Sequence, residues 1–532
     1  MPRDQSQEST LRSVVASLSP SNAPSRLELT IVFHPDARRI GTRAILPADS
    51  RRKTLLLGRY TPLFPDQQSD SGDGEFGLDD RHVSRSALRL KPTPSGIRIG
   101  KCPGACRCRV DGIELDEERA FSIEQLDAGI SLFLGHSVVL LLRRNSVDQA
   151  RNIVPAGSAD DGMVGSSTYM GGLREQIERL AARSDDVLVL GETGSGKELV
   201  VRALHNKSAR SNRPLVAVNM AAITPSLAPA LLFGAVRGSF TGASGNTAGF
   251  FQQAAGGSLF LDEVGDTPRE IQAQLLRAVQ QREIQPVGGS LLSVDLRIIS
   301  ATDANLDNPG SGFKDALRYR LAATEITVQP LRCHREDIGE LAWHFLQSSC
   351  LEQHKNGLLP ASASTETDLA LWAELFHLLL RHPWPGNIRQ LANVIGQVVL
   401  ASDAEPVLPQ KLERELTGWE RSPPTTVDSE DKQRPLVVAT QVEIDAALLA
   451  ADYQVAVAAK RLGITRQSVY KHIDHSPQLR LAADIPLAEL QQMLNACAGD
   501  FAQAALKFKV SRHGLRARLR ECRVGPVAGV NM

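Results

Sequence analysis

The chain has 532 residues, of which 42% are hydrophobic and 23% charged, so it is long enough for several domains with buried cores. Lys plus Arg and Asp plus Glu both number 60, and this balance argues against a wholly basic coat for nucleic acid or anionic membrane. Seven cysteines do not make a disulfide scaffold, no apolar run reaches the roughly 18 residues of a membrane span, and the polar start shows no secretory signal. We expect a reduced, cytoplasmic protein.

The N-terminal third predicts a β-domain between two irregular segments. Residues 1–25, rich in Ser, Pro and Gln, predict a disordered lead. Short apolar runs separated by turn signals fill residues 26–146, at spacings that suit a small β-sandwich. Residues 147–163 lack periodicity and are expected to form a linker.

The middle of the chain predicts an α/β domain followed by helices. Over residues 164–330, strand-like runs such as DVLVLG and SLFLDE alternate with helical stretches. Residues 331–402 have helical patterns, which predict an α-helical lid. Residues 403–440 are polar and contain prolines, so we expect a second linker there.

A Gly-rich loop lies between a predicted strand and a predicted helix of the α/β domain. Such a loop places backbone N–H groups around phosphate oxygens at a helix N-terminus, and its lysine supplies a positive charge. The alternative, a chance Gly-rich turn, does not explain the strand and helix on either side. The candidate phosphate-binding residues are Gly191, Glu192, Thr193, Gly194, Ser195, Gly196, Lys197 and Glu198.

A second candidate element is SLFLDE, an apolar strand that ends in two carboxylates, Asp262 and Glu263. Beside a phosphate-binding loop, this pair suits nucleotide hydrolysis. Asp262 would bind Mg²⁺ and Glu263 would polarise the attacking water. The alternative is a solvated acidic strand end.

With these motifs, the chain from Val164 to Ala401 resembles the AAA+ domain of bacterial enhancer-binding proteins, the activators of sigma-54 RNA polymerase. GETGSGKELV is similar to that family's P-loop, in which Glu follows the Lys, and LFLDEVGD is similar to its Walker B strand. GSFTGA resembles the family's loop that contacts sigma-54, and WPGNIRQL resembles its sensor II motif.

The resemblance implies roles for further residues. Asn219 would be the switch residue that holds Glu263, Thr302 the sensor I residue, and Arg389 the sensor II residue. It also implies a ring, expected to be a hexamer, with ATP and Mg²⁺ at the subunit interfaces. The sigma-54 contact would be made by Gly238, Ser239, Phe240, Thr241, Gly242 and Ala243.

The chain departs from the family pattern at several positions. The family usually has two arginines that reach the neighbouring subunit's ATP; FKDALRYRL keeps Arg320 but has Lys314 at the first position. Lysine lacks the planar fork of arginine, so this exchange is not neutral, and Arg318, one helical turn on, is a candidate substitute. A solvated basic helix face is the alternative for Arg318. Asp303 stands where the family usually has Asn or His.

The N-terminal β-domain resembles a forkhead-associated (FHA) domain, whose loops bind phosphothreonine. Arg59, Ser84 and Arg85 match positions that contact the phosphate or the peptide, and an arginine fork with a hydroxyl donor suits a phosphate dianion. The family's supporting His falls on Ala87 and its loop Asn near Cys106, so a scaffold that has lost this binding is the alternative. Three nearby cysteines lack a fourth ligand for structural zinc, and we expect no metal there.

The C-terminal region contains a tandem repeat. AAKRLGITRQSVYKHI and AALKFKVSRHGLRARL align without gaps at an offset of 46 residues, and both copies resemble the Fis-type helix-turn-helix. We expect all-α modules at 441–480 and 481–524; the alternative for either copy is a packing module that does not bind DNA. The candidate DNA contacts are Arg466, Gln467, Ser468 and Lys471 in the first copy, and Arg512, His513 and Arg516 in the second.

Together these features predict a sigma-54-dependent transcription activator. ATP hydrolysis would remodel the closed polymerase–promoter complex, with double-stranded DNA at upstream sites and a phosphothreonine-bearing protein as further partners. One alternative is a DNA-binding regulator whose ATPase has decayed, and another is a AAA+ remodeller of a different target. The net charge is unevenly distributed: residues 441–532 hold 12 basic and 8 acidic residues, whereas the whole chain is neutral.

Overall fold

The structure is a computed structural model that divides into two compact units, residues 1–422 and 423–532. In the first unit it describes residues 25–46, 54–65, 74–146, 162–239, 245–304, 306, 312–360, 365–403 and 405–418. In the second it describes residues 441–451, 453–455, 458, 469, 473, 480, 485–497, 501–511 and 515. Among these residues, no helix combines the length and apolar character that crossing a membrane requires.

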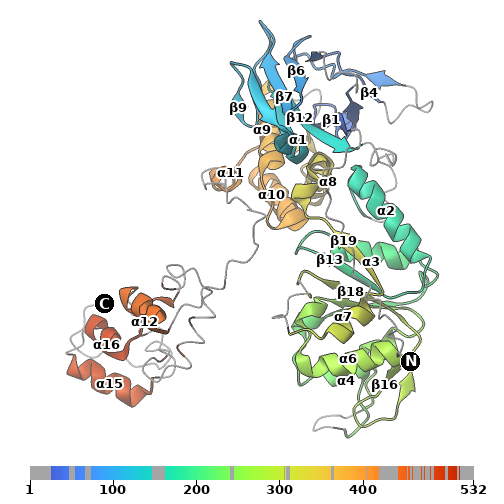
Figure 1. Cartoon of the computed structure of the whole chain (residues 1–532), viewed down its shortest axis with the longest axis vertical. Coiled ribbons are helices and arrows are strands. Elements are labelled where there is room, and N and C mark those ends of the chain that lie inside the picture. Colours follow the sequence, from blue (N-terminus) through green and yellow to red (C-terminus); the bar gives the residue numbers. More distant parts are fainter. Residues whose placement is uncertain are drawn as a thin grey trace, which may run out of the picture. The chain divides into compact units, whose positions relative to one another are not determined.

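The N-terminal domain has two larger antiparallel sheets around one core and a separate two-stranded sheet of β4 and β5 (Figure 1). The larger sheet has the order β2-β1-β12-β11-β8-β9 and the smaller the order β10-β7-β6-β3. Alternating apolar residues such as Leu29, Ile31, Leu88 and Leu90 fill the space between them. The elements are β1 (Ser25–Phe33), β2 (Arg43–Ile45), β3 (Leu55–Leu57), β4 (Phe64–Pro65), β5 (Glu75–Phe76), β6 (Leu88–Thr93), β7 (Gly96–Lys101), β8 (Cys108–Val110), β9 (Ile113–Glu114), β10 (Arg119–Ser122), α1 (Ile123–Ala128), β11 (Ile130–Leu134) and β12 (Val138–Ser146).

The central domain is a five-stranded parallel sheet of order β14-β15-β18-β13-β19, with helices packed against it. Because the strands are parallel, the loops that follow β13, β15 and β18 leave the sheet at the same edge. The elements are α2 (Thr168–Ala181), β13 (Val187–Gly191), α3 (Lys197–Asn206), β14 (Leu215–Asn219), α4 (Ala228–Phe233), α5 (Phe250–Gln253), β15 (Ser258–Asp262), α6 (Arg269–Gln281), β16 (Glu283–Ile284), β17 (Leu292–Ser293), β18 (Arg297–Thr302), α7 (Asp315–Leu321) and β19 (Thr324–Val328).

Four helices form the lid: α8 (Ile338–Glu352), α9 (Glu366–Arg381), α10 (Asn387–Ala401) and α11 (Gln410–Gly418). The last of these lies inside residues 403–440, which we expected to be a linker. Leu412 and Leu416 of α11 are buried in the lid core beside Trp372. The lid therefore extends past residue 402, because an amphipathic helix follows the polar turn.

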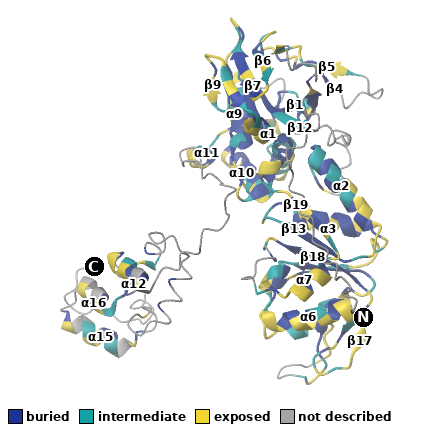
Figure 2. Ribbon diagram, in the orientation of Figure 1, coloured by how far each residue is buried: buried dark blue, intermediate teal, exposed yellow. Residues whose placement is uncertain are grey.

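The lid and the N-terminal domain share one hydrophobic core (Figure 2). Val32 and Phe33 of β1 pack with Phe376 of α9, and the Phe33 and Phe376 ring centroids are 4.8 Å apart. Phe133 of β11 lies against α9 as well, 5.2 Å from the ring of His377. We call this surface the sandwich–lid contact.

The second unit contains α12 (Gln441–Ala450), α15 (Leu487–Ala496) and α16 (Phe501–Phe508), with two separate small apolar clusters. The clusters use equivalent positions of the two repeat copies, 46 residues apart. The buried pairs are Ile444 and Leu490, Ala451 and Cys497, Ala458 and Ala504, and Val469 and Leu515. The repeat predicted from sequence therefore corresponds to a repeated core.

Candidate functional site

The predicted phosphate-binding loop connects β13 to the first residue of α3. Gly194 (φ 76°) and Gly196 (φ 100°) adopt the left-handed conformation that glycine tolerates best. Lys197 begins α3, is almost fully buried, and donates from Nζ to the Gly191 carbonyl at 2.7 Å. The buried hydroxyl of Ser195 has no hydrogen-bond partner among the described residues, so the loop retains a polar group for a ligand.

Two carboxylates lie at the end of β15, at the same sheet edge as the loop. Burial raises the pKa of Asp262, an effect that the nearby charges of Lys197 and Arg389 oppose. Burial and the charge of Asp303 raise the pKa of Glu263, whose backbone has the left-handed φ of 50°. A non-glycine residue in this conformation is typical of strained functional sites.

The strands beside β15 bring the predicted switch and sensor residues to this edge. Asn219 ends β14 directly opposite Asp262, and its amide oxygen accepts from the N–H groups of Ala221 and Ala222. The predicted hold of Asn219 on Glu263 stays a prediction. Thr302 ends β18 and is buried. The next residue, Asp303, accepts a hydrogen bond from the Thr193 hydroxyl of the P-loop.

The lid closes over the phosphate-binding loop through polar contacts. Glu192 of the loop accepts from Arg332 at 2.8 Å and from the Asn387 amide at 3.1 Å, and these bonds lower its pKa to about 2. The backbone N–H of Arg389 donates to the Gly194 carbonyl at 3.3 Å. The predicted sensor II residue thus lies next to the P-loop of its own chain.

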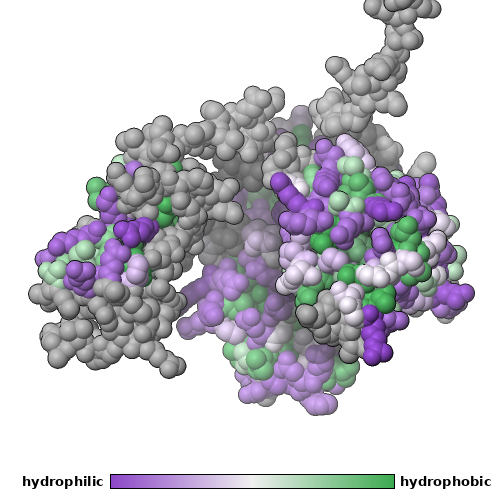
Figure 3. Space-filling view, turned by 90° about the horizontal axis from the view of Figure 1, so that it is seen from below, coloured by the Kyte–Doolittle hydropathy of each residue, from purple (hydrophilic) through white to green (hydrophobic). Residues whose placement is uncertain are grey.

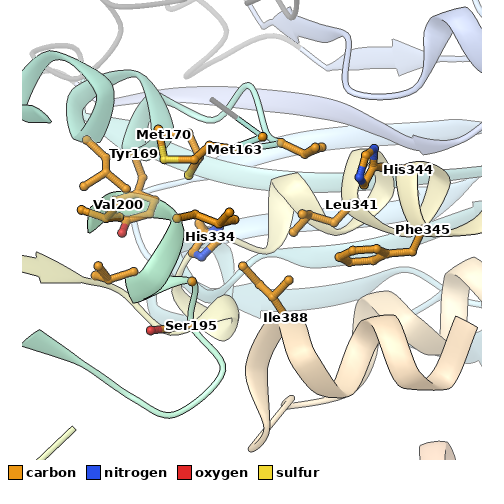
Figure 4. A pocket seen from close by; sticks show the side chains of 16 residues that line it. Met163, Tyr169, Met170, Ser195, Val200, His334, Leu341, His344, Phe345 and Ile388 are labelled. Carbon is orange, nitrogen blue, oxygen red and sulfur yellow. The ribbon is translucent and has the colours of Figure 1, made fainter. Parts of the chain in front are cut away.

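An apolar pocket opens between the loop, α2 and the lid (Figure 4). Of its lining, Ser195 and Gly196 belong to the predicted phosphate-binding loop, whereas no motif in the sequence singles out the apolar residues. The apolar lining comes from six separate segments, and only the fold unites them. It includes Met163 before α2, Tyr169 and Met170 of α2, Val200 of α3, Val328 of β19, Leu341 and Phe345 of α8, and Ile388 of α10. A mostly apolar hollow with a few polar groups beside a phosphate-binding loop suits a flat heteroaromatic base.

Helix α7 carries the residues predicted to reach a neighbouring subunit. Lys314 is its N-cap and Arg320 lies near its end, and both are exposed. Arg318, the candidate substitute, is largely buried and pairs with Glu325 of its own chain at 3.4 Å. This contact argues against Arg318 as the substitute for Lys314, because the Arg318 side chain is already engaged within its own chain.

The predicted sigma-54 loop is described only at its base, Gly238 and Ser239; Phe240, Thr241, Gly242 and Ala243 lie outside the described residues. The base rests on the β16–β17 hairpin, because the Val236 N–H donates to the Val287 carbonyl at 3.0 Å. That hairpin carries the exposed Leu291 and Leu292. Figure 3 shows a face on which apolar residues appear as small areas among hydrophilic ones.

The predicted phosphopeptide residues come together on loops of the N-terminal domain. Arg59 donates from Nε to the Val83 carbonyl at 2.9 Å, and the Ser84 hydroxyl accepts from the Cys106 N–H at 2.8 Å. Arg85 is exposed on the same loop as Ser84. Hydrogen bonds from Cys108 and Ser84 lower the pKa of the Cys106 thiol to about 5. Cys106 lies near the position at which the resemblance to FHA domains places a loop Asn.

The DNA-contact residues Arg466, Gln467, Ser468, Lys471, Arg512, His513 and Arg516 lie outside the described residues. Among the described residues, no group of three or more His, Cys, Asp or Glu side chains could hold a metal ion.

Known proteins match this chain over the central domain and the lid. A family profile described as "Sigma-54 interaction domain" matches residues 163–327, and one described as "AAA+ ATPase lid domain" matches residues 332–429. The transcriptional regulatory protein ZraR of Klebsiella oxytoca is 41% identical over 59% of this chain and 68% of its own length. The DNA-binding transcriptional regulator NtrC of Salmonella typhimurium is 42% identical over 50% of this chain and 55% of its own.

Among solved structures, NtrX from Brucella abortus in complex with ADP matches at 28% identity. The match covers 69% of this chain and 71% of that one, with a TM-score of 0.42. The family profiles and the length of the ZraR match determine the assignment, which agrees with the P-loop, the paired carboxylates and the lid. The chain therefore belongs to the sigma-54-dependent transcriptional activators and has a AAA+ ATPase domain.

Proposed function

We propose that this protein binds ATP in the pocket between the P-loop and the lid and uses its hydrolysis to activate sigma-54 RNA polymerase. One observation carries the proposal: Lys197, Asp262, Glu263, Thr302 and Arg389 converge at one sheet edge beside an apolar pocket. Active sites of parallel α/β sheets lie at this edge.

The residues divide the chemistry of hydrolysis between them. The N–H groups of the P-loop and Lys197 would hold the β- and γ-phosphates, and Arg389 would add positive charge from the lid. The Asp262 carboxylate suits Mg²⁺, which takes oxygen ligands and would neutralise phosphate charge. Glu263 would orient and polarise the attacking water. Its raised pKa reflects a partly desolvated base close to the reaction.

The assembly and the targets follow from exposed elements. Arg320 is exposed on α7 and would complete the site of a neighbouring copy, as a ring or hexamer requires. Gly238 to Ala243 would grip sigma-54 beside the exposed hairpin that carries Leu291 and Leu292. The tandem modules at 441–524 would bind upstream double-stranded DNA, with the basic residues after Lys507 contacting phosphates.

The N-terminal domain would sense a phosphothreonine-bearing protein through Arg59, Ser84 and Arg85. Its geometry supports regulation of the ATPase, because the same loop reaches the lid. Arg81 lies 3.6 Å and His82 4.0 Å from Glu366 at the start of α9. A ligand on this loop would therefore act next to a lid helix.

The test combines ATP turnover with sigma-54 binding. We expect the full chain to hydrolyse ATP and to bind purified sigma-54 in the presence of ADP–aluminium fluoride, which mimics the transition state. Lys197→Ala should abolish both, whereas Lys207→Ala, which removes a surface lysine paired with Glu178 at 2.9 Å, should change neither. No turnover in the assembled ring would favour a regulator with a decayed ATPase. Turnover without sigma-54 binding would favour a remodeller of another target.

A further inference from the structure

A short turn between the parallel sheet and the lid contacts both the nucleotide site and the N-terminal domain. Residues 331–337, here called the lid turn, form two short 3-10 helices, Leu331–Cys333 and Arg335–Asp337, before α8 begins. The turn is largely buried around His334 and Asp337, whose side chains are hydrogen-bonded at 2.9 Å. Its position makes it a link between two sites that are distant in sequence.

On the nucleotide side, the lid turn holds the P-loop directly. Arg332 donates to the Glu192 carboxylate, and the buried Asn387 accepts from the Leu331 N–H at 2.9 Å. Asn387 also donates to Glu192 and to the Thr193 carbonyl, each at 3.1 Å. His334 lines the apolar pocket (Figure 4). A shift of the turn would therefore move both the P-loop contacts and one wall of the pocket.

On the other side, the N-terminal domain holds the same turn. Arg143 of β12 donates to the Cys333 carbonyl at 3.0 Å and to the buried Glu336 carboxylate at 2.6 Å. Arg335 donates in return to the Ala128 and Gly129 carbonyls, at 2.8 and 2.9 Å. All four are charge-assisted hydrogen bonds, and two of them, Arg143 to Glu336 and Arg335 to Gly129, are partly buried, where such bonds are stronger than on an open surface.

We propose that Arg143 is a positioning residue for the nucleotide site: it fixes the lid turn, and the turn fixes Glu192 and the pocket wall. The N-terminal domain then completes the ATP site rather than covering it. The proposal rests on the proposed function only in requiring that the P-loop pocket binds nucleotide. It adds a route by which a ligand of the N-terminal domain changes ATP affinity.

Arg144 provides a matched control for this proposal. It is the next residue on β12, and it pairs with Asp127 inside its own domain through two hydrogen bonds of 2.7 Å. Arg143→Ala and Arg144→Ala therefore remove the same side chain from adjacent positions, but only Arg143 contacts the lid turn. Neither substitution removes a side chain of the apolar part of the sandwich–lid contact around Phe33 and Phe376.

The experiment measures the dissociation constant for a fluorescent ADP analogue with the full chain. We expect Arg143→Ala to bind about five- to tenfold more weakly than the wild type, at the low end of couplings between distant sites. Arg144→Ala should stay within about twofold of the wild type. Equal affinities for the two variants, or tighter binding by Arg143→Ala, would overturn the proposal. Lack of binding by the wild type would instead refute the nucleotide site itself.

Three further measurements separate positioning from folding. Arg143→Lys should recover part of the affinity, because lysine keeps one charged donor. Glu336→Gln combined with Arg143→Ala should weaken binding less than the two separate effects added together, because both side chains act through one contact. In ATP turnover, the KM should rise while kcat changes less than about twofold. A fall in kcat with unchanged KM, or additive effects in the pair, would contradict positioning through the turn.

Discussion

The lid has two unlike neighbours. Towards the N-terminal domain it presents an apolar face, in which Phe33, Phe133 and Phe376 are fully or almost fully buried. Towards the P-loop, beside the apolar pocket, its hydrogen bonds and ion pairs form a polar face, and the Arg332–Glu192 pair there is 46% and 42% exposed. Each buried aromatic side chain contributes about 1.5–3 kcal/mol, whereas an exposed ion pair contributes about 0–1 kcal/mol.

This difference indicates which contact opens during a catalytic cycle. The apolar face behaves as the inside of one domain, so the lid and the N-terminal domain are expected to move together. The contacts of the polar face can break and form again with little change in free energy. A contact that changes with the nucleotide state requires this property. The proposed regulation through the N-terminal domain therefore needs no separate docking event.

The largest effect should come from the chemistry beneath the polar face. Glu263→Gln keeps the shape of the side chain but removes the base, so ATP turnover should fall by at least about 100-fold. ADP affinity should remain within about threefold, because Glu263 is not among the residues that hold the phosphates. Turnover that survives in this variant would place the base elsewhere.

A smaller effect should come from forcing apart the apolar face. A Cβ added at Gly339 of α8 would lie 2.5 Å from the Val32 carbonyl oxygen, so Gly339→Ala should destabilise the sandwich–lid contact by about 1–3 kcal/mol. Gly396→Ala is the control, since a Cβ at this glycine of α10 meets nothing within 4 Å. Only Gly339→Ala should lower the free energy of unfolding of the full chain, measured by urea unfolding. Equal changes in the free energy of unfolding for the two variants would show that the close approach of Gly339 to Val32 does not contribute to stability.

The apolar face should also be sensitive to acid. Burial, with the charges of Arg109, Arg381 and Arg335, lowers the pKa of His377 to about 3, and neither ring nitrogen has a partner among the described residues. Below pH 6.5, His377 therefore binds a proton more readily in the unfolded chain than in the folded one. The free energy of unfolding falls for this reason as the pH drops from about 6.5 towards 3. At pH 5.5 this amounts to about 1.4 kcal/mol.

His377→Leu should remove that part of the pH dependence. The measurement is the difference in unfolding free energy between pH 7.5 and 5.5 for the wild type and the variant. A variant with the same pH dependence as the wild type would show that His377 is not held neutral at the contact.

The smallest effect should come from the polar face itself. Glu192→Gln weakens an exposed pair, so the free energy of unfolding should fall by less than about 0.5 kcal/mol at neutral pH. Arg332 and Asn387 lower the pKa of Glu192 to about 2, so this contribution is present above pH 4.5 and is lost as the pH falls towards 2. It should also shrink as salt increases. A loss as large as that from Gly339→Ala would contradict the contrast between the two faces.

The sequence predicted the local motifs better than the long-range packing. The P-loop and Asp262–Glu263 were predictable because each chemical group lies within a few residues of its strand. The sandwich–lid contact was less predictable, and its one indication was the unbroken apolar run VVLLL of β12. Within this run, Val139 and Leu141 face the lid, whereas Leu140 and Leu142 face the sandwich core. Such a run predicts a strand covered on both sides but does not identify what covers it.

Other features depended on contacts between distant segments. The pocket wall combines residues before and within α2 with residues of α8 and α10, and no spacing in the sequence connects them. Asp303 looked like a departure from the family pattern, yet it accepts a hydrogen bond from Thr193 of the P-loop. Arg318 matched the spacing of a helical face, but its position beside Glu325 was set by β19.

The most direct test of the account is transcription from a sigma-54-dependent promoter with upstream sites for this protein, using purified sigma-54 RNA polymerase. We predict promoter opening and transcripts with the full chain and ATP, and none with a non-hydrolysable ATP analogue or with Glu263→Gln. Transcripts that form equally well without hydrolysis would contradict the central claim that ATP turnover at this site drives activation.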